Sequence, residues 1–290
     1  MTEQLRILML GAHHDDNDLL GGGTALKYLQ AGHRVRFLSM TNGCAGHHVD
    51  KPDVLAARRR TESKTVEALT GIEYDTWDVN DGELIADLEN RKKLIRYIRN
   101  YAPDVIFCHR TNDYHPDHRN AAMLMQDASY LLIVPNVCPD APAMRKMPVI
   151  MFFYNGFANP TFRADVAIDI GDVIDRKYDM LNCHVSQFYE WLPYTYGALD
   201  EVPADPAARL EWFRSPRVPR DRVLSLEELS KIKKGGHHEY REAKYAAHGR
   251  EALIARYGEC GAKIIFAEVF ELSAYGQGLT EETKKTLFPF

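Results

Sequence analysis

The sequence has no apolar run that could cross a membrane, for which about eighteen consecutive residues are needed. Its first residues, MTEQLRILML, lack the basic segment of a secretion signal, so we expect them to lead into a first strand. The cysteines number five, are widely spaced and include no pair with C-x-x-C spacing, which indicates thiols in a reducing compartment. These absences predict a cytoplasmic protein with reduced thiols and no membrane partner.

An excess of basic residues is missing as well. The net charge of -5 gives no reason to expect nucleic acid as a partner. With 290 residues, 45% of them hydrophobic and 27% charged, the chain has the composition of a globular protein with a sizeable core. Because no repeat, low-complexity tract or linker divides it, we predict a single domain over 1–290. Its core covers about 5–190, and 191–290 is a less regular part that packs on this core.

Strand-like and helix-like patterns alternate in the first half of the chain. Strands are expected at Leu5–Leu10, Arg34–Met40, Tyr74–Val79 and Val105–Cys108. Helices are expected at Gly22–Ala31, Val54–Leu69 and Glu89–Asn100. This alternation predicts βαβ units, hence an α/β fold with a mostly parallel sheet and helices on both of its faces.

The second half is less regular. Helices are expected at Asn120–Leu132, Ile174–Glu190 and Glu239–Tyr257, and strands at Val149–Phe153, Ala164–Ile170 and Ala262–Leu272. Between them, 191–236 is rich in proline, aromatic and charged residues and has no clear periodicity. We expect this irregular region to cover the rim of the active site.

The stretch with the most chemistry is ILMLGAHHDDND, from Ile7 to Asp18, in which an apolar run passes one glycine and ends in histidines and aspartates. A second cluster, His115-Pro116-Asp117-His118, follows the apolar run at 105–108. In open α/β sheets ligands bind at the carboxyl ends of strands, and right-handed crossovers place these loops on one edge. We therefore predict that the two clusters meet around one metal ion.

The residue types favour zinc. His13 and Asp16 are three positions apart, and His118 would complete a set of two nitrogens and one oxygen that leaves a position open for water, as in catalytic zinc sites. Asp15 would point elsewhere and could act as a base beside the metal. Another divalent metal stays open, and so does a contribution from the second imidazole, His14.

The segment GAHHDDNDLLGGGTALKYLQAGHRVRFLSMTNG, followed by RRTE and then HPDH, resembles the LmbE-like (PIG-L) family of zinc-dependent N-deacetylases. The resemblance runs from about Arg6 to Gln187. The family's first motif is usually Pro-His-Pro-Asp-Asp, and Ala12 and His14 replace the two prolines here. The resemblance implies a Rossmann-like fold and hydrolysis of an acetamido group, commonly on a sugar.

The resemblance also implies roles for individual residues. The metal ligands would be His13, Asp16 and His118, with Asp15 as general base. His115 would stabilise the oxyanion or protonate the leaving amine, and Asp117 would orient a neighbouring histidine. Arg59 and Asp81 fall at substrate-contacting positions. Arg59 could equally form a surface ion pair with Glu62, and Asp81 could belong to a simple Asp-Gly turn.

Several functions therefore remain open. The leading hypothesis is deacetylation of an N-acetyl sugar or glycoside, and a close alternative is amide hydrolysis on another acylated small molecule, such as a thiol conjugate. A nucleotide-binding Rossmann protein is less favoured, because Gly21-Gly22-Gly23 lacks G-x-G-x-x-G spacing and the carboxylates would repel a pyrophosphate. A metal-binding module without catalysis is a further alternative. A homo-oligomer stays open too.

Overall fold

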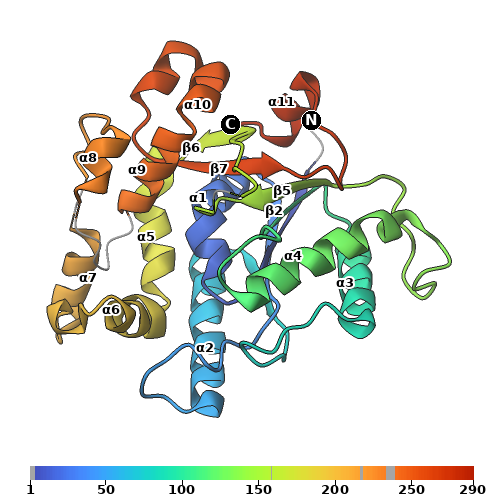
Figure 1. Cartoon of the computed structure of the whole chain (residues 1–290), viewed down its shortest axis with the longest axis horizontal. Coiled ribbons are helices and arrows are strands. Elements are labelled where there is room, and N and C mark those ends of the chain that lie inside the picture. Colours follow the sequence, from blue (N-terminus) through green and yellow to red (C-terminus); the bar gives the residue numbers. More distant parts are fainter. Residues whose placement is uncertain (1–3, 158, 216–217, 233–238) are drawn as a thin grey trace.

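The computed structural model describes residues 4–157, 159–215, 218–232 and 239–290. Seven strands form one sheet in the order β3-β2-β1-β4-β5-β7-β6. The strands are β1 (Arg6–Gly11), β2 (Arg34–Ser39), β3 (Glu73–Thr76), β4 (Val105–Cys108), β5 (Val149–Phe153), β6 (Val166–Asp169) and β7 (Ala267–Leu272). Helices cover both faces (Figure 1), so the predicted α/β fold is confirmed.

The first five strands are parallel, and β1 is their central member. Ile7 of β1 is paired in register with Val35 of β2 on one side and with Val105 of β4 on the other. The carboxyl ends of these strands therefore lie at one edge of the sheet. β7 runs antiparallel to both β5 and β6, which makes the sheet mixed rather than purely parallel.

The helices lie in two layers around this sheet. They are α1 (Asp16–Gln30), α2 (Pro52–Thr70), α3 (Leu88–Tyr101), α4 (Pro116–Ser129), α5 (Ile174–Asn182), α6 (Leu192–Thr195), α7 (Pro206–Arg214), α8 (Leu226–Ser230), α9 (Glu239–His248), α10 (Arg250–Tyr257) and α11 (Glu281–Leu287). Side chains of α1, α2 and α5 share one core with Ile7 and Met9, whereas α3 and α4 share another with Leu8 and Leu10. Alternate residues of β1 thus face opposite layers, as the pleat of a buried strand requires.

Two helices begin earlier than the sequence predicts, and both start in the polar clusters. α1 begins at Asp16 instead of Gly22, and α4 begins at Pro116 instead of Asn120. The first turn of each helix is polar and lacks an apolar periodicity, so the pattern does not indicate it. For α4, proline at the first helical position is a known start signal. Both clusters therefore lie at helix N-termini, where the helix dipole favours negative charge.

Other boundaries also differ from the predictions. The helix expected at Ile174–Glu190 ends at Asn182, and a π-helical turn covers Ser186–Trp191. The helix expected at Glu239–Tyr257 is divided at Gly249, where a Cβ atom would lie 2.4 Å from Val269 Cγ1, so only glycine permits this close approach to β7. β3, β6 and β7 are shorter than expected.

The region without a prediction, 191–236, contains the short helices α6, α7 and α8 over its described part. Asp205 caps α7, and Ser225 with Glu228 forms a capping box on α8. Tyr194 of α6 stacks on His48 in the loop after β2, with ring centroids 4.3 Å apart. None of the helices in the described ranges is long and apolar enough to span a membrane.

Candidate active site and metal centre

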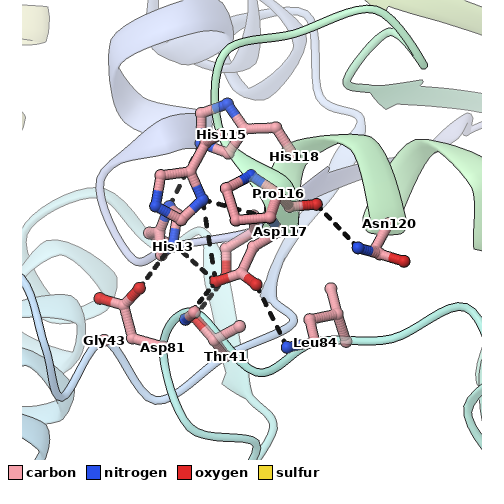
Figure 2. A network of polar contacts seen from close by, with 12 residues as sticks. His13, Thr41, Gly43, Asp81, Leu84, His115, Pro116, Asp117, His118 and Asn120 are labelled. Atoms are coloured by element: carbon pink, nitrogen blue, oxygen red, sulfur yellow. Dashed lines mark hydrogen bonds and ion pairs between the residues drawn. The ribbon is translucent and has the colours of Figure 1, made fainter.

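The two polar clusters meet where β1 and β4 end (Figure 2). His13 Nδ1 lies 3.2 Å from His118 Nε2 and 3.4 Å from Asp16 Oδ2, and His118 Nε2 lies 3.4 Å from Asp16 Oδ1. All three side chains are largely buried. In a tetrahedral zinc site with bonds of about 2.0–2.1 Å, neighbouring ligand atoms are about 3.3 Å apart. Asp16 offers Oδ2 toward His13 and Oδ1 toward His118, and all three separations are close to this value, so the three residues could hold a metal ion.

Hydrogen-bond partners decide which nitrogen of each ring faces this centre. His13 Nε2 lies 3.1 Å from Asp81 Oδ1 and 3.2 Å from Asp117 Oδ2, so its proton belongs on Nε2 and the Nδ1 lone pair points inward. His118 Nδ1 lies 3.0 Å from Asp113 Oδ1, which leaves the Nε2 lone pair facing the same point. Carboxylates that fix ligand histidines in this way are typical of metal sites.

His109, which the sequence reasoning missed, also lies at this centre. Its Nε2 is 3.1 Å from Asp16 Oδ2, and its ring stacks on His118 at a centroid distance of 4.0 Å. Asp16, His109 and His118 thus form a second group whose atoms could hold a metal, and His13, His115 and His118 form a third. A signal was available in the sequence, because His109 directly follows β4, much as His13 follows β1 after a single alanine.

Asp113 is the second residue that the sequence reasoning missed. It stands two positions before His115 and is 7% exposed. His14, by contrast, does not face the centre. Its Nε2 lies 3.2 Å from Thr76 Oγ1 on β3, and burial lowers its pKa well below the usual value.

Arg59 reaches the centre from α2. It is 2% exposed, its Nη2 donates to Asp15 Oδ1 at 2.5 Å, and its Nη1 lies 3.9 Å from Asp81 Oδ2. Glu62 accepts instead from the backbone N and the Oγ of Ser186, at 2.8 and 2.7 Å. The surface ion pair considered for Arg59 and Glu62 is thus replaced by a buried pair between Arg59 and Asp15.

Asp117 connects the turn after β3 to the centre. Its carboxylate accepts from the backbone N–H of Gly82 at 2.6 Å and of Leu84 at 3.1 Å, in addition to its contact with His13. Figure 2 shows these bonds converging on Asp117 from the turn that carries Asp81. The Asp-Gly turn is therefore more than a connection, because it brings Asp81 against His13.

The electrostatics of the centre favour a cation. Burial alone would lower the pKa of His13, but hydrogen bonds to Asp117, Asp16 and Asp81 raise it well above the usual value. Burial alone would raise the pKa of Asp16, but His118 and His109 hold it well below its usual range. The pKa of His115 is lowered, by burial first and then by His13 and His118. A proton on His13 thus balances the charge of the same carboxylates that a bound metal ion would neutralise.

Comparison with known proteins assigns the first part of the chain. Residues 8–129 match the model of the family PIG-L, described as GlcNAc-PI de-N-acetylase. These residues belong to the PIG-L family. A diacetylchitobiose deacetylase of Thermococcus kodakarensis is 28% identical over 204 residues, which are 65% of this chain and 74% of that protein. A 4-oxalmesaconate hydratase of Pseudomonas putida is 25% identical over 206 residues, which are 68% of this chain and 80% of that protein.

Solved structures with the same fold extend well beyond the PIG-L segment. An N,N'-diacetylchitobiose deacetylase of Pyrococcus horikoshii aligns with a TM-score of 0.66 at 21% identity, covering 94% of this chain and 85% of that one. A 4-carboxy-2-hydroxymuconate hydratase of Pseudomonas putida aligns with a TM-score of 0.64 at 18% identity, covering 96% and 99%. The chain is an enzyme whose residues 8–129 match the PIG-L family, and the proteins similar to it include both deacetylases and hydratases.

Proposed function

We propose that this enzyme is a zinc-dependent hydrolase that removes the acetyl group from an N-acetylated amino sugar or glycoside. The observation that carries the proposal is the triangle of His13 Nδ1, Asp16 and His118 Nε2, with Asp15 and His115 beside it. These three residues would hold the metal, and each imidazole is backed by a carboxylate. Other first-row divalent ions accept the same ligands, so zinc is the expected metal and not the only competent one.

A zinc ion bound there would polarise the amide carbonyl and lower the pKa of a water to about 7. Asp15 is the proposed general base. It precedes the proposed ligand Asp16, and Arg59 holds one of its carboxylate oxygens by a hydrogen bond. As the water oxygen bonds to the carbonyl carbon, Asp15 takes the water's proton. That proton is then available to the leaving nitrogen when the C–N bond breaks.

His115 is the proposed donor to the oxyanion. Its Nδ1 accepts the backbone N–H of Asp117 at 3.2 Å, so a neutral ring carries its proton on Nε2. The ring lies edge-on to His13, with centroids 4.5 Å apart. Because the pKa of His115 is lowered, the neutral ring is favoured, and its Nε2–H can donate to the developing oxyanion without a full positive charge.

The surroundings of Gly46 support a sugar as the substrate. A Cβ atom built on Gly46 would lie 3.5 Å from Arg59 Nη1, 3.6 Å from Asp81 Oδ2 and 3.7 Å from Gln187 Oε1. One donor and two acceptors thus lie around the side of Gly46 that carries no side chain. Hydroxyl groups both donate and accept, so this arrangement suits a polyol better than a second carboxylate.

Hydration of an unsaturated carboxylic acid is a second candidate, since one relative is a 4-oxalmesaconate hydratase. Such a substrate carries several negative charges, whereas a bound zinc ion and the already paired Arg59 would supply three positive charges against the five carboxylates of Asp15, Asp16, Asp81, Asp113 and Asp117. This balance of charge favours a neutral acetamido sugar.

Acetate release decides between these functions. The zinc-loaded enzyme would be incubated with N-acetylglucosamine, N,N'-diacetylchitobiose, an N-acylated thiol conjugate and 4-oxalmesaconate. We expect equimolar acetate and free amine from an acetylated sugar, loss of both after chelation, and recovery with zinc. Hydration of the unsaturated acid without acetate release from any amide would overturn the proposal.

A further inference from the structure

Asp113 is the branching point of a hydrogen-bonded chain behind His118. One carboxylate oxygen, Oδ1, lies 3.0 Å from His118 Nδ1 and also accepts the backbone N–H of His115 at 3.2 Å. The other, Oδ2, accepts from Asn155 Nδ2 at 3.1 Å. With both oxygens occupied, the carboxylate has one orientation, and His118 is held by it.

Asn155 can take part in this chain only with its amide in one orientation. Its Oδ1 accepts from Arg110 Nη1 at 3.1 Å, and its Nδ2 donates to the backbone oxygen of Asn112 at 2.7 Å as well as to Asp113. A flipped amide would place its oxygen against the Asp113 carboxylate and its NH₂ against the guanidinium. The assignment of nitrogen and oxygen therefore follows from the partners.

Arg110, which directly follows His109, is itself fixed at three points. Its Nε lies 3.1 Å from Glu271 Oε2 on β7, its Nη2 donates to the backbone oxygen of Pro160 at 2.8 Å, and its Nη1 reaches Asn155. Asn155 and Glu271 lie beyond residue 129, outside the segment that matches the PIG-L family. The antiparallel part of the sheet is thus connected to the predicted metal ligand.

We infer that Arg110 and Asn155 are positioning residues that hold Asp113 and thereby aim Nε2 of His118 at the metal. The inference rests on the metal site of the proposed function. A donor–acceptor chain of this kind keeps the proton on Nδ1 and the ring in one orientation, so the protein does not have to order the ligand when the ion binds. Loss of such a partner typically weakens metal binding about 10- to 100-fold.

Asn155→Ala tests the chain, with Asn112→Ala as its matched control. The Asn112 side chain donates to the backbone oxygen of Asn159, so it also joins the two loops. It takes no part, however, in the hydrogen bonds that connect Arg110 through Asn155 to Asp113. The zinc Kd would be measured by chelator competition and thermal unfolding recorded for each variant. We expect Asn155→Ala to weaken zinc binding about tenfold. Asn112→Ala should leave the Kd unchanged.

Two further measurements separate positioning from a general loss of structure. In metal-free protein, the imidazole ¹⁵N shifts of His118 should report the Nδ1–H form, and Asn155→Ala should give a mixture of tautomers. In an Asp113→Ala background, Asn155→Ala should change the Kd no further, because its effect passes through Asp113. Asn155→Asp keeps the shape but sets two carboxylates together, so it should weaken zinc binding more than Asn155→Ala does.

An unchanged Kd and an unchanged His118 tautomer in Asn155→Ala would overturn the inference, as would equal weakening by Asn112→Ala. None of these measurements depends on acetate release. Failure of the deacetylase assay with a tenfold change in Kd would therefore reject the reaction and keep the positioning chain.

Discussion

The two halves of the molecule both bury charged side chains, but they do so in different ways. At the ends of β1 and β4, the polar atoms that remain after hydrogen bonding converge on one point. In the second half, Lys177 Nζ bonds to Glu242, Glu268 and the Leu19 backbone oxygen within 2.9 Å. Glu268 also accepts from two backbone N–H groups of α1. A buried charge indicates chemistry where lone pairs of several residues meet at a shared centre, and structure where opposite charges pair with one another, as Lys177 does, even though Glu242 Oε2 has no hydrogen-bond partner among the described residues.

Asp15→Asn should have the largest effect on catalysis and tests the chemical half of this comparison. The amide is nearly isosteric but cannot take a proton, so turnover on an acetamido sugar should fall about 10²- to 10⁴-fold. Asp15 is not among the three proposed ligands, and zinc per chain should stay close to that of the unchanged enzyme. Metal analysis after gel filtration and acetate release measure both. Wild-type turnover in this variant would assign the base elsewhere.

Lys177→Met tests whether the buried charges of the second half stabilise the fold. The substitution leaves two carboxylates buried without their cation, and breaking such a group typically costs about 3–5 kcal/mol. Lys27→Met is the control, because Lys27 pairs with an exposed Asp172, an interaction worth about 0–1 kcal/mol. Denaturant unfolding compares the two variants. Equal losses would show that the Lys177 group contributes no more than a surface pair.

The sequence predicts the first half better than the second for a physical reason. The strands of the parallel sheet are buried on both faces and separated by helices, so β1, β2 and β4 are found within one residue of their predicted ends. Where helices begin and end in the second half depends on tertiary contacts and caps that leave no periodic pattern in the sequence. Gly249 divides a continuous helical pattern because β7 approaches it closely, and α6 to α8 are short, polar and held by caps.

The same distinction applies to the candidate site. His13, Asp16, His115 and His118 stand in two compact motifs that the sequence presents directly. Asp113 and Asn155 have no motif of their own, because their role depends on hydrogen bonds that form only in the folded structure. Arg59 was predicted as a substrate contact, and its bond to Asp15 became visible only with α2 in place.

Metal binding should depend on pH through His13. Because the neighbouring carboxylates raise the pKa of His13 above 6.5, its proton stabilises the metal-free protein below that value, and this contribution is lost as the pH rises through the raised pKa. Zinc must displace this proton, so its affinity should rise about tenfold per pH unit below the raised pKa and level off above it. Calorimetry between pH 6 and 9 measures it. An affinity independent of pH over this range would mean that His13 is not protonated in the metal-free enzyme.

Gly46→Ala should have the smallest effect and tests whether the substrate packs against Gly46, near Arg59, Asp81 and Gln187. The added methyl group would lie 3.5–3.7 Å from these three side chains, an ordinary van der Waals contact, so neither the fold nor the zinc content should change. A sugar hydroxyl that packs against Gly46 would be pushed away by the methyl group, and we expect KM to rise a few-fold with kcat unchanged, the result of weakened uniform binding. Gly278→Ala is the matched control, since no atom lies within 4 Å of its Cβ position. If KM for the best acetylated sugar is the same in both variants, the polar groups around Gly46 do not bind that sugar, and Arg59 serves Asp15 alone.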